Sequence, residues 1–202
     1  MDANPPSITT LHDKLELIRR RLAPADAVPM PPTRGHKAAA VLLPLVDHNG
    51  SASILYTRRA DRMKTHPGQV AFPGGRLDLT DKDLVSAALR ETYEEVGIRP
   101  SDIHVLGSFA GRRTLATNIM VTPFVGAVSE GAETRPDPKE VAEIFYVPIA
   151  ALRDKRYRTK AKPVLSTRIG ELPAIVYEGQ TIWGLTYYLT MSFLGLIAGT
   201  GL

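Results

Sequence analysis

Apolar stretches along the chain predict several β-strands. KAAAVLLPLV and SASILYTRR, residues 37–46 and 51–59, are rich in apolar and β-branched side chains and flank the turn sequence DHNG. Asn49-Gly50 within that turn favours a tight hairpin. Apolar stretches of the same kind predict further strands at residues 102–110, 118–129, 143–149 and 173–179.

Apolar residues at helical spacing predict a helix near the N-terminus and a second in the middle of the chain. The first contains Leu11, Leu15, Ile18 and Leu22 on one face, after a capping residue at Thr10. The second follows FPGG, residues 72–75, and is expected to start with Thr80 as cap and Asp83 three residues later. Its inward stripe is expected to comprise Val85, Ala88, Leu89, Thr92 and Val96.

A third helix is predicted at the C-terminus. No charged side chain occurs from Gly179 to Leu202, and the apolar stretch is long enough to approach a membrane span. Glycines, hydroxyl side chains and two adjacent tyrosines interrupt it, and basic flanks are missing. Because apolar residues recur every four positions, we interpret the segment as a buried helix; these residues are Leu185, Leu189, Phe193 and Ile197.

Together these elements predict an α+β fold in a layered α/β/α sandwich. Residues 23–35 are rich in proline and should form a linker. We therefore expect an N-terminal helix and Pro-rich linker over residues 1–35, followed by the main domain over residues 36–202.

Composition narrows the class of protein. The chain has 202 residues, of which 44% are hydrophobic, enough for a full core. It contains no cysteine, which excludes a disulfide scaffold and a Cys-ligated zinc site. The formal charge of +4 indicates an ordinary solvated surface, and the N-terminus has no secretory signal pattern, so we expect a cytoplasmic protein with neither nucleic acid nor membrane as partner.

The sequence RETYEEVGI, residues 90–98, places Glu91, Glu94 and Glu95 at the end of the central helix, where the helix dipole disfavours anions. The three acids span an arc of roughly 100° beside the apolar stripe, so we expect them on a solvent-accessible edge, with Arg90 relieving only Glu94. Oxygen ligands on a rigid helix suit Mg²⁺ or Mn²⁺. The alternative is a solvated acidic face.

The stretch FPGGRLDLTDKDLVSAALRETYEEVGI, residues 72–98, resembles the Nudix box. The second half matches from Arg90 to Ile98, with Thr92 in the apolar position. The first half departs, because the segment from Gly75 to Arg90 is one residue longer than the pattern. The substitutes for the expected first glutamate are Asp78, Asp81 and Asp83, among which the sequence does not choose.

This resemblance implies a Nudix hydrolase, with a mixed sheet and a catalytic helix after a glycine turn, that cleaves the diphosphate of a nucleoside derivative by metal-assisted attack of water. It implies that Glu91 and Glu95 bind Mg²⁺ or Mn²⁺, that Glu94 is a ligand or orients water, and that Arg90 holds an acidic neighbour. In this superfamily the general base is often an acid outside the box, and the candidates are Glu140 and Glu143.

The region upstream resembles the signature of coenzyme A pyrophosphatases within that superfamily. In LYTRRADRMKTHPGQVAFPGG, residues 55–75, the signature positions in register are Leu55, Thr57, Arg59, Gly68 and the FPGG sequence. Tyr56, Ala60 and Lys64 depart from the signature, and Lys64 keeps the positive charge of the arginine that it replaces. IWGLT, residues 182–186, resembles the terminal helix of that subfamily.

The candidate substrate contacts lie in this upstream region and in the glycine turn. Arg58, Arg59, Arg62 and Lys64 provide positive charge for phosphates, and we expect at most two of these four side chains to touch substrate. Gly74 and Gly75 allow the backbone to approach a phosphate closely.

Three functions follow from these resemblances. The first is hydrolysis of coenzyme A or its derivatives to 3′,5′-ADP and (acyl-)4′-phosphopantetheine. The second is hydrolysis of another nucleoside diphosphate derivative such as ADP-ribose. The third is a silent nucleic-acid-binding module, which the intact acidic triad argues against, because its carboxylates repel phosphate without metal. The oligomeric state stays open, with a homodimer among the options.

Overall fold

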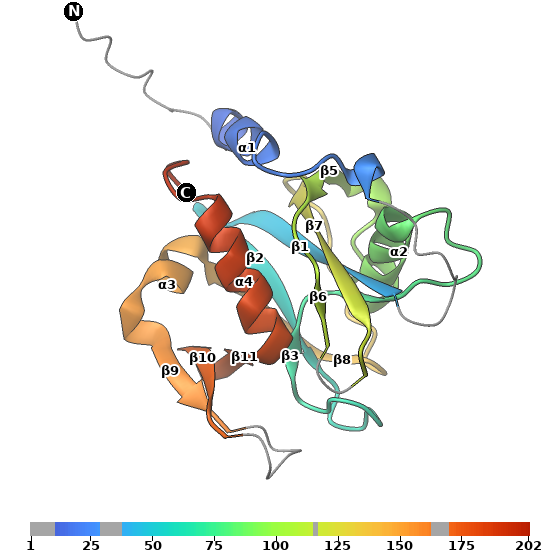
Figure 1. Ribbon diagram of the computed structural model, residues 1–202, viewed down its shortest axis with the longest axis vertical. Helices are drawn as coiled ribbons and strands as arrows, with labels where there is room; N and C mark the ends of the chain where they lie inside the picture. The colour runs from blue at the N-terminus through green and yellow to red at the C-terminus, as the bar shows by residue number, and fades with distance from the viewer. Residues whose placement is uncertain (1–10, 29–37, 115–116, 163–169) are drawn as a thin grey trace, which may run out of the picture.

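The computed structural model describes residues 11–28, 38–114, 117–162 and 170–202 (Figure 1). The helices are α1 (Leu11–Arg19), α2 (Leu84–Val96), α3 (Ile149–Arg153) and α4 (Gly184–Leu196). The strands are β1 (Ala38–His48), β2 (Ser51–Arg59), β3 (Val70–Ala71), β4 (Gly74–Arg76), β5 (Ile103–Ser108), β6 (Arg112–Arg113), β7 (Met120–Val128), β8 (Val141–Pro148), β9 (Arg158–Ala161), β10 (Leu172–Tyr177) and β11 (Gln180–Trp183).

The large sheet is mixed. Its main path runs β3-β2-β1-β7-β5, with β4 paired to β1, β6 to β7 and β8 to β2. β1 and β7 are parallel along eight residue pairs, and the remaining pairs in the sheet are antiparallel. The predicted hairpin between β1 and β2 is confirmed, since Asn49 and Gly50 have φ values of 53° and 74° and Gly50 N donates to Asp47 Oδ1 at 2.9 Å.

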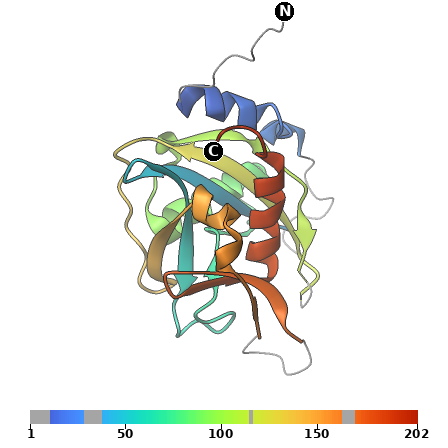
Figure 2. The same ribbon diagram turned by 90° about the vertical axis from the view of Figure 1, so that its left-hand side faces the viewer.

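Two helical layers cover the two faces of this sheet (Figure 2). Alternate residues of the strands point to opposite sides. On one side, Leu42 and Phe124 form a core cluster with Leu84 of α2. On the other side, the next residues along β1 and β7, Leu43 and Val125, belong to the cluster that contains α4. The predicted α+β fold with an α/β/α arrangement is therefore confirmed.

The N-terminal helix α1 and the turn after it join the cluster on the α4 side. In α1 and the turn after it, Ile18 and Leu22 are buried in that cluster. Ala23 then exchanges two backbone hydrogen bonds with Ser108, at 2.9 and 2.8 Å. The predicted cap at Thr10 and the later part of the Pro-rich linker, residues 29–35, lie outside the described residues.

The C-terminal helix α4 is buried along one face, as predicted. Leu189, Phe193 and Ile197 are at most 1% exposed, and Leu185 packs against the same cluster. None of the helices in the described ranges is long and apolar enough to cross a membrane. Beside α4 lies a three-stranded sheet in the order β11-β10-β9, of which only β10 had been predicted.

Helix α2 begins later than the pattern predicts. Asp83 is the N-cap, and its Oδ1 accepts a hydrogen bond from Ser86 N at 2.7 Å. The prediction of Thr80 as cap is wrong, because the backbone N–H and hydroxyl of Thr80 donate instead to Asp78 in the preceding turn. At the other end, Gly97 adopts the left-handed conformation and terminates the helix, as expected.

Candidate active site

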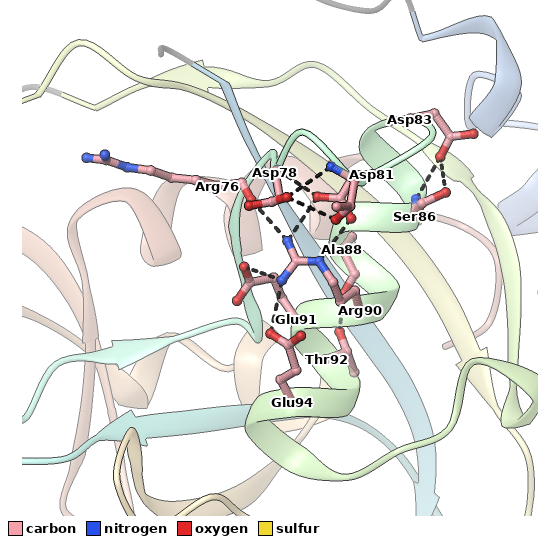
Figure 3. Close-up of polar contacts among 11 residues, drawn as sticks. Arg76, Asp78, Asp81, Asp83, Ser86, Ala88, Arg90, Glu91, Thr92 and Glu94 are labelled. Carbon is pink, nitrogen blue, oxygen red and sulfur yellow. Dashed lines mark hydrogen bonds and ion pairs between the residues drawn. The ribbon is translucent and has the colours of Figure 1, made fainter. Parts of the chain in front are cut away.

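Arg90 is the centre of an ionic cluster on α2 (Figure 3). Its Nε and Nη2 donate to the two oxygens of Asp81, both at 2.9 Å. Its Nη1 donates to Glu91 at 2.9 Å and to Glu94 at 3.0 Å. The expectation that Arg90 relieves only Glu94 is therefore wrong: the planar guanidinium lies among three carboxylates and bonds them all.

Asp81 is the one of the three candidate aspartates that pairs with Arg90. Its side chain is 3% exposed, and it also accepts a hydrogen bond from Asp78 N at 2.7 Å. The bidentate bond to Arg90 holds the pKa of Asp81 below its ordinary value. Asp78 and Asp83 organise the turn and the helix cap instead. The extra residue in the loop hid this assignment from the sequence pattern.

The three glutamates of the triad do not share one exposed edge. The side chains of Glu91, Glu94 and Glu95 are 19%, 55% and 6% exposed. The prediction of a solvent-accessible edge is wrong for Glu95, because this side chain turns under the glycine turn. There its Oε2 accepts a hydrogen bond from Gly74 N at 3.1 Å, and its Oε1 lies 3.8 Å from Arg59 Nη1.

Burial changes the protonation of the two inner acids. Desolvation raises the pKa of Glu95 to about 7, against the opposing effects of the Gly74 N–H and Arg59. Desolvation also raises the pKa of Glu91, against the bonds from Arg90. The charge of Glu140 contributes to the upward pKa shift of both groups. The two inner acids are therefore crowded together in a poorly solvated place, where their charged forms are disfavoured.

The glycine turn fits closely over these acids. A Cβ atom on Gly75 would lie 2.4 Å from Glu91 Cδ, and one on Gly74 would lie 2.4 Å from the carbonyl oxygen of Ala40. Gly74 also has a φ of 149°, which side chains rarely adopt. Any residue larger than glycine at 75 would therefore have to displace the Glu91 carboxylate.

Glu91 and Glu95 are one helical turn apart and could hold one divalent cation. Within the described ranges, no three His, Asp or Glu side chains are already gathered for a metal ion. Mg²⁺ commonly uses only one or two carboxylates, with substrate phosphates and water completing its shell. The two hard oxygen donors and their raised pKa values fit such a cation, whose charge would relieve their repulsion.

The two acids outside the box have different surroundings. Glu143, on β8, accepts hydrogen bonds from Gln180 Nε2 at 2.8 Å and from Arg58 Nε at 3.4 Å. Glu140 precedes β8 and is exposed, and its carboxylate has no hydrogen-bond or ion-pair partner within the part of the chain that the structure describes. The charge of Glu140 raises the pKa values of Glu91 and Glu95, so Glu140 lies within electrostatic reach of this acid pair.

The basic residues at the end of β2 and in the loop after it have different partners. Arg58 contacts Glu143 and Asp61, the latter at 3.4 Å, whereas Arg59 points to Glu95. Lys64 is exposed and makes no ion pair within the described residues. Among the four basic residues predicted to contact substrate, the structure thus brings only Arg59 into the cluster of Glu91 and Glu95.

Arg62 has a structural role that the sequence did not indicate. Its guanidinium donates to the carbonyl oxygens of Pro138 and Lys139, the latter at 3.4 Å. In the same segment, the carbonyl oxygen of Glu140 accepts a hydrogen bond from Ala60 N at 2.8 Å. Arg62 therefore holds the segment that presents Glu140. No sequence signal distinguishes it from its basic neighbours, because its partners are backbone atoms.

Comparisons with known proteins agree with this arrangement. The NUDIX domain family matches residues 35–167. A Pectobacterium atrosepticum protein named uncharacterized Nudix hydrolase NudL is 34% identical over 186 residues, covering 90% of this chain and 92% of the relative. The protein of that name from Yersinia enterocolitica is 42% identical over 153 residues, covering 73% and 75%. A MutT/nudix family structure from Enterococcus faecalis has a TM-score of 0.51 at 14% identity, covering 92% of this chain and 72% of that one, which supports the fold alone.

Proposed function

Because the chain belongs to the Nudix domain family and is a hydrolase of nucleoside diphosphate derivatives, we propose that its substrate is coenzyme A or an acyl derivative. Water would cleave the diphosphate to give 3′,5′-ADP and (acyl-)4′-phosphopantetheine. The observation that carries this proposal is the stretch 55–75, which resembles the coenzyme A signature. In support, that stretch runs as one unit from β2 through β3 into the glycine turn above Glu91 and Glu95.

In this proposal Glu91 and Glu95 hold the divalent cation, Mg²⁺ or Mn²⁺. When bound, such a cation neutralises charge on the diphosphate and lowers the pKa of a water molecule. Arg90 positions Glu91 through its 2.9 Å bond, and Asp81 anchors Arg90. Glu94, bonded to Arg90 but 55% exposed, is free to turn toward the cation or to orient water.

We assign Glu140 as the general base that accepts the proton of the attacking water. Its carboxylate is exposed and close enough to Glu91 and Glu95 to raise their pKa values. A base needs an acceptor atom that is not already occupied. Glu143 is the weaker candidate, because Gln180 and Arg58 both donate to its Oε2 and leave only Oε1 as an open acceptor among the described contacts.

Arg59 and Lys64 are the proposed phosphate contacts. Arg59 lies beside the glycine turn and serves the diphosphate, whereas Lys64 is exposed in the loop after β2 and serves the remote 3′-phosphate. Arg58 is a weaker candidate, since its guanidinium already pairs with Glu143 and Asp61. Two contacts agree with the limit expected from the sequence.

A comparison of coenzyme A with dephospho-coenzyme A tests this assignment. Both carry the reacting diphosphate, and only coenzyme A carries the 3′-phosphate. A charge-assisted hydrogen bond contributes roughly 1.5–3 kcal/mol, so kcat/KM should favour coenzyme A by about ten- to a hundredfold. Lys64→Ala should reduce that ratio, whereas Lys160→Ala, an exposed lysine on β9, should leave it unchanged.

The assay should include ADP-ribose and both Mg²⁺ and Mn²⁺. Equal kcat/KM values for coenzyme A and dephospho-coenzyme A would remove the 3′-phosphate site from the proposal. Faster hydrolysis of ADP-ribose than of either would make ADP-ribose the better substrate assignment.

A further inference from the structure

Two arginines flank the pair Glu91 and Glu95, and they are satisfied to different degrees. Arg90 makes hydrogen bonds of 2.9–3.0 Å to three carboxylates. Arg59 has one ion-pair contact, 3.8 Å from its Nη1 to Glu95 Oε1. The Nε of Arg59 is buried and has no hydrogen-bond partner within the described part of the chain. Arg90 is therefore saturated, while Arg59 retains unused donors.

An unused donor in this position is costly. Arg59 is 20% exposed at its side chain, and a buried N–H without an acceptor loses its hydration without replacement. A separation of 3.8 Å is also longer than a hydrogen bond, so the contact with Glu95 is only electrostatic. Guanidinium has five donors in a planar fork that fits phosphate oxygens. The unpaired Nε thus marks a place for an acceptor that the described residues do not provide.

The backbone directs Arg59 to this place. The pairing of β2 with β8 shifts register between Arg58 and Arg59, so that Arg58 pairs with Glu143 and Arg59 with Val141. Such an irregularity changes the direction of the side chain that follows it. Arg58 remains over the Glu143 side of the sheet, and Arg59 reaches Glu95 beside the glycine turn.

We propose that Arg59 is an exchangeable counterion. In the metal-free protein it neutralises Glu95, and when Glu95 is engaged by a divalent cation, Arg59 transfers its guanidinium to an oxygen of the substrate diphosphate. This inference rests on the proposed diphosphate hydrolysis and adds a coupling between two ligands. Arg59 weakens the binding of the cation when the cation binds alone. It strengthens the binding of the diphosphate when the diphosphate binds together with the cation. The two ligands therefore bind with positive cooperativity, which is reciprocal.

Calorimetric titration of Mn²⁺ into the metal-free protein tests the first part of the proposal, that Arg59 competes with the cation for Glu95. Arg59→Gln removes the competing charge, so Mn²⁺ should bind about three- to tenfold more tightly than to the unaltered protein. Arg59→Lys keeps the charge and should retain the original affinity. Arg99→Gln, which removes a 69% exposed arginine paired with Asp102, is the matched control and should have no effect.

Titration with α,β-methylene ADP, a non-hydrolysable diphosphate, at saturating Mn²⁺ tests the second part of the proposal, that Arg59 binds the diphosphate once the cation is in place. Arg59→Gln should weaken this binding by about tenfold or more, and Arg59→Lys should give an intermediate loss because the ammonium lacks the fork. A variant that binds both ligands more weakly would show that Arg59 merely organises Glu95. Unchanged affinity for either ligand would also overturn the exchange.

These measurements are separable from the proposed substrate. The Mn²⁺ titration requires no substrate, and the diphosphate probe lacks the pantetheine arm and the 3′-phosphate. A protein that failed to hydrolyse coenzyme A could still show opposite changes for Mn²⁺ and the diphosphate in Arg59→Gln, which would support the exchange alone.

Discussion

At the residue scale, three acids within five positions of one helix have three different environments. Glu95 is buried under the glycine turn, Glu91 is held by Arg90, and Glu94 is more than half exposed. Helical spacing could predict that the three lie close together. It could not predict the burial of Glu95, because that depends on a strand formed by residues twenty positions earlier in the chain.

Replacing either inner acid should remove activity. Glu91→Gln and Glu95→Gln keep the side-chain volume but remove the charge that holds the cation, and kcat should fall by about a hundredfold or more. Turnover should be measured at saturating metal, with the exposed Glu171→Gln as control. Near-normal turnover in either variant would show that the altered acid is not a metal ligand.

The stability of the metal-free protein should depend on Glu95 and pH. Its pKa is raised from 4.5 to about 7 in the folded state, so the folded protein binds this proton more tightly than the unfolded chain. The resulting stabilisation is complete below about pH 4.5 and is lost as pH rises to about 7, a loss on the order of 3 kcal/mol. The free energy of unfolding, measured by urea denaturation in the presence of a chelator at pH 5 and pH 8, reports this loss of stability.

Glu95→Gln is the control for that experiment, because it cannot titrate. It should flatten the pH dependence and leave the metal-free protein more stable than the unaltered protein at pH 8. An unaltered protein with the same pH dependence as Glu95→Gln would contradict the raised pKa.

At the element scale, the apolar stripe could predict that α2 exists but not where it begins. Thr80 and Asp83 are both capping residue types, and the pattern alone could not choose between them. The choice is made by the turn, in which Asp78 accepts from Thr80 and leaves Asp83 for the helix. The sequence pattern also missed the shortest strands. β3, β4 and β6 have only two or three residues, too few to form a recognisable apolar pattern.

The two capping candidates can be compared directly. Asp83→Ala removes the side-chain acceptor of Ser86 N and should lower the free energy of unfolding by about 1 kcal/mol. Thr80→Ala, in an exposed turn, should cost less than half of that amount. Chemical denaturation of both variants gives the comparison. A larger loss of stability from Thr80→Ala than from Asp83→Ala would show that Thr80 is the helix cap.

At the scale of the whole molecule, the layers and the β1–β2 hairpin could be predicted, whereas the pairing of strands distant in sequence could not. The continuous apolar run of β1 and the apolar face of α4 are local patterns, and both indicate a sheet that is covered by helices. The parallel pairing of β1 with β7 has no local signal, because it depends on contacts between distant segments. The same holds for Arg59 and Glu95, whose proximity arises only when β2 and α2 are both in place.

The parallel pairing of β1 with β7 affects how the chain emerges from the ribosome. Ala38 pairs with Met120 and Leu45 with Ala127, so α2 is synthesised before the central ladder can close. Leu84 of α2 shares its core with Phe124 of β7, and until β7 appears that apolar face has only part of its packing surface. Contacts between such distant segments slow folding, since loop closure precedes their stabilisation. The helix that bears Glu91 and Glu95 therefore reaches its final packing late, after most of the chain has been translated.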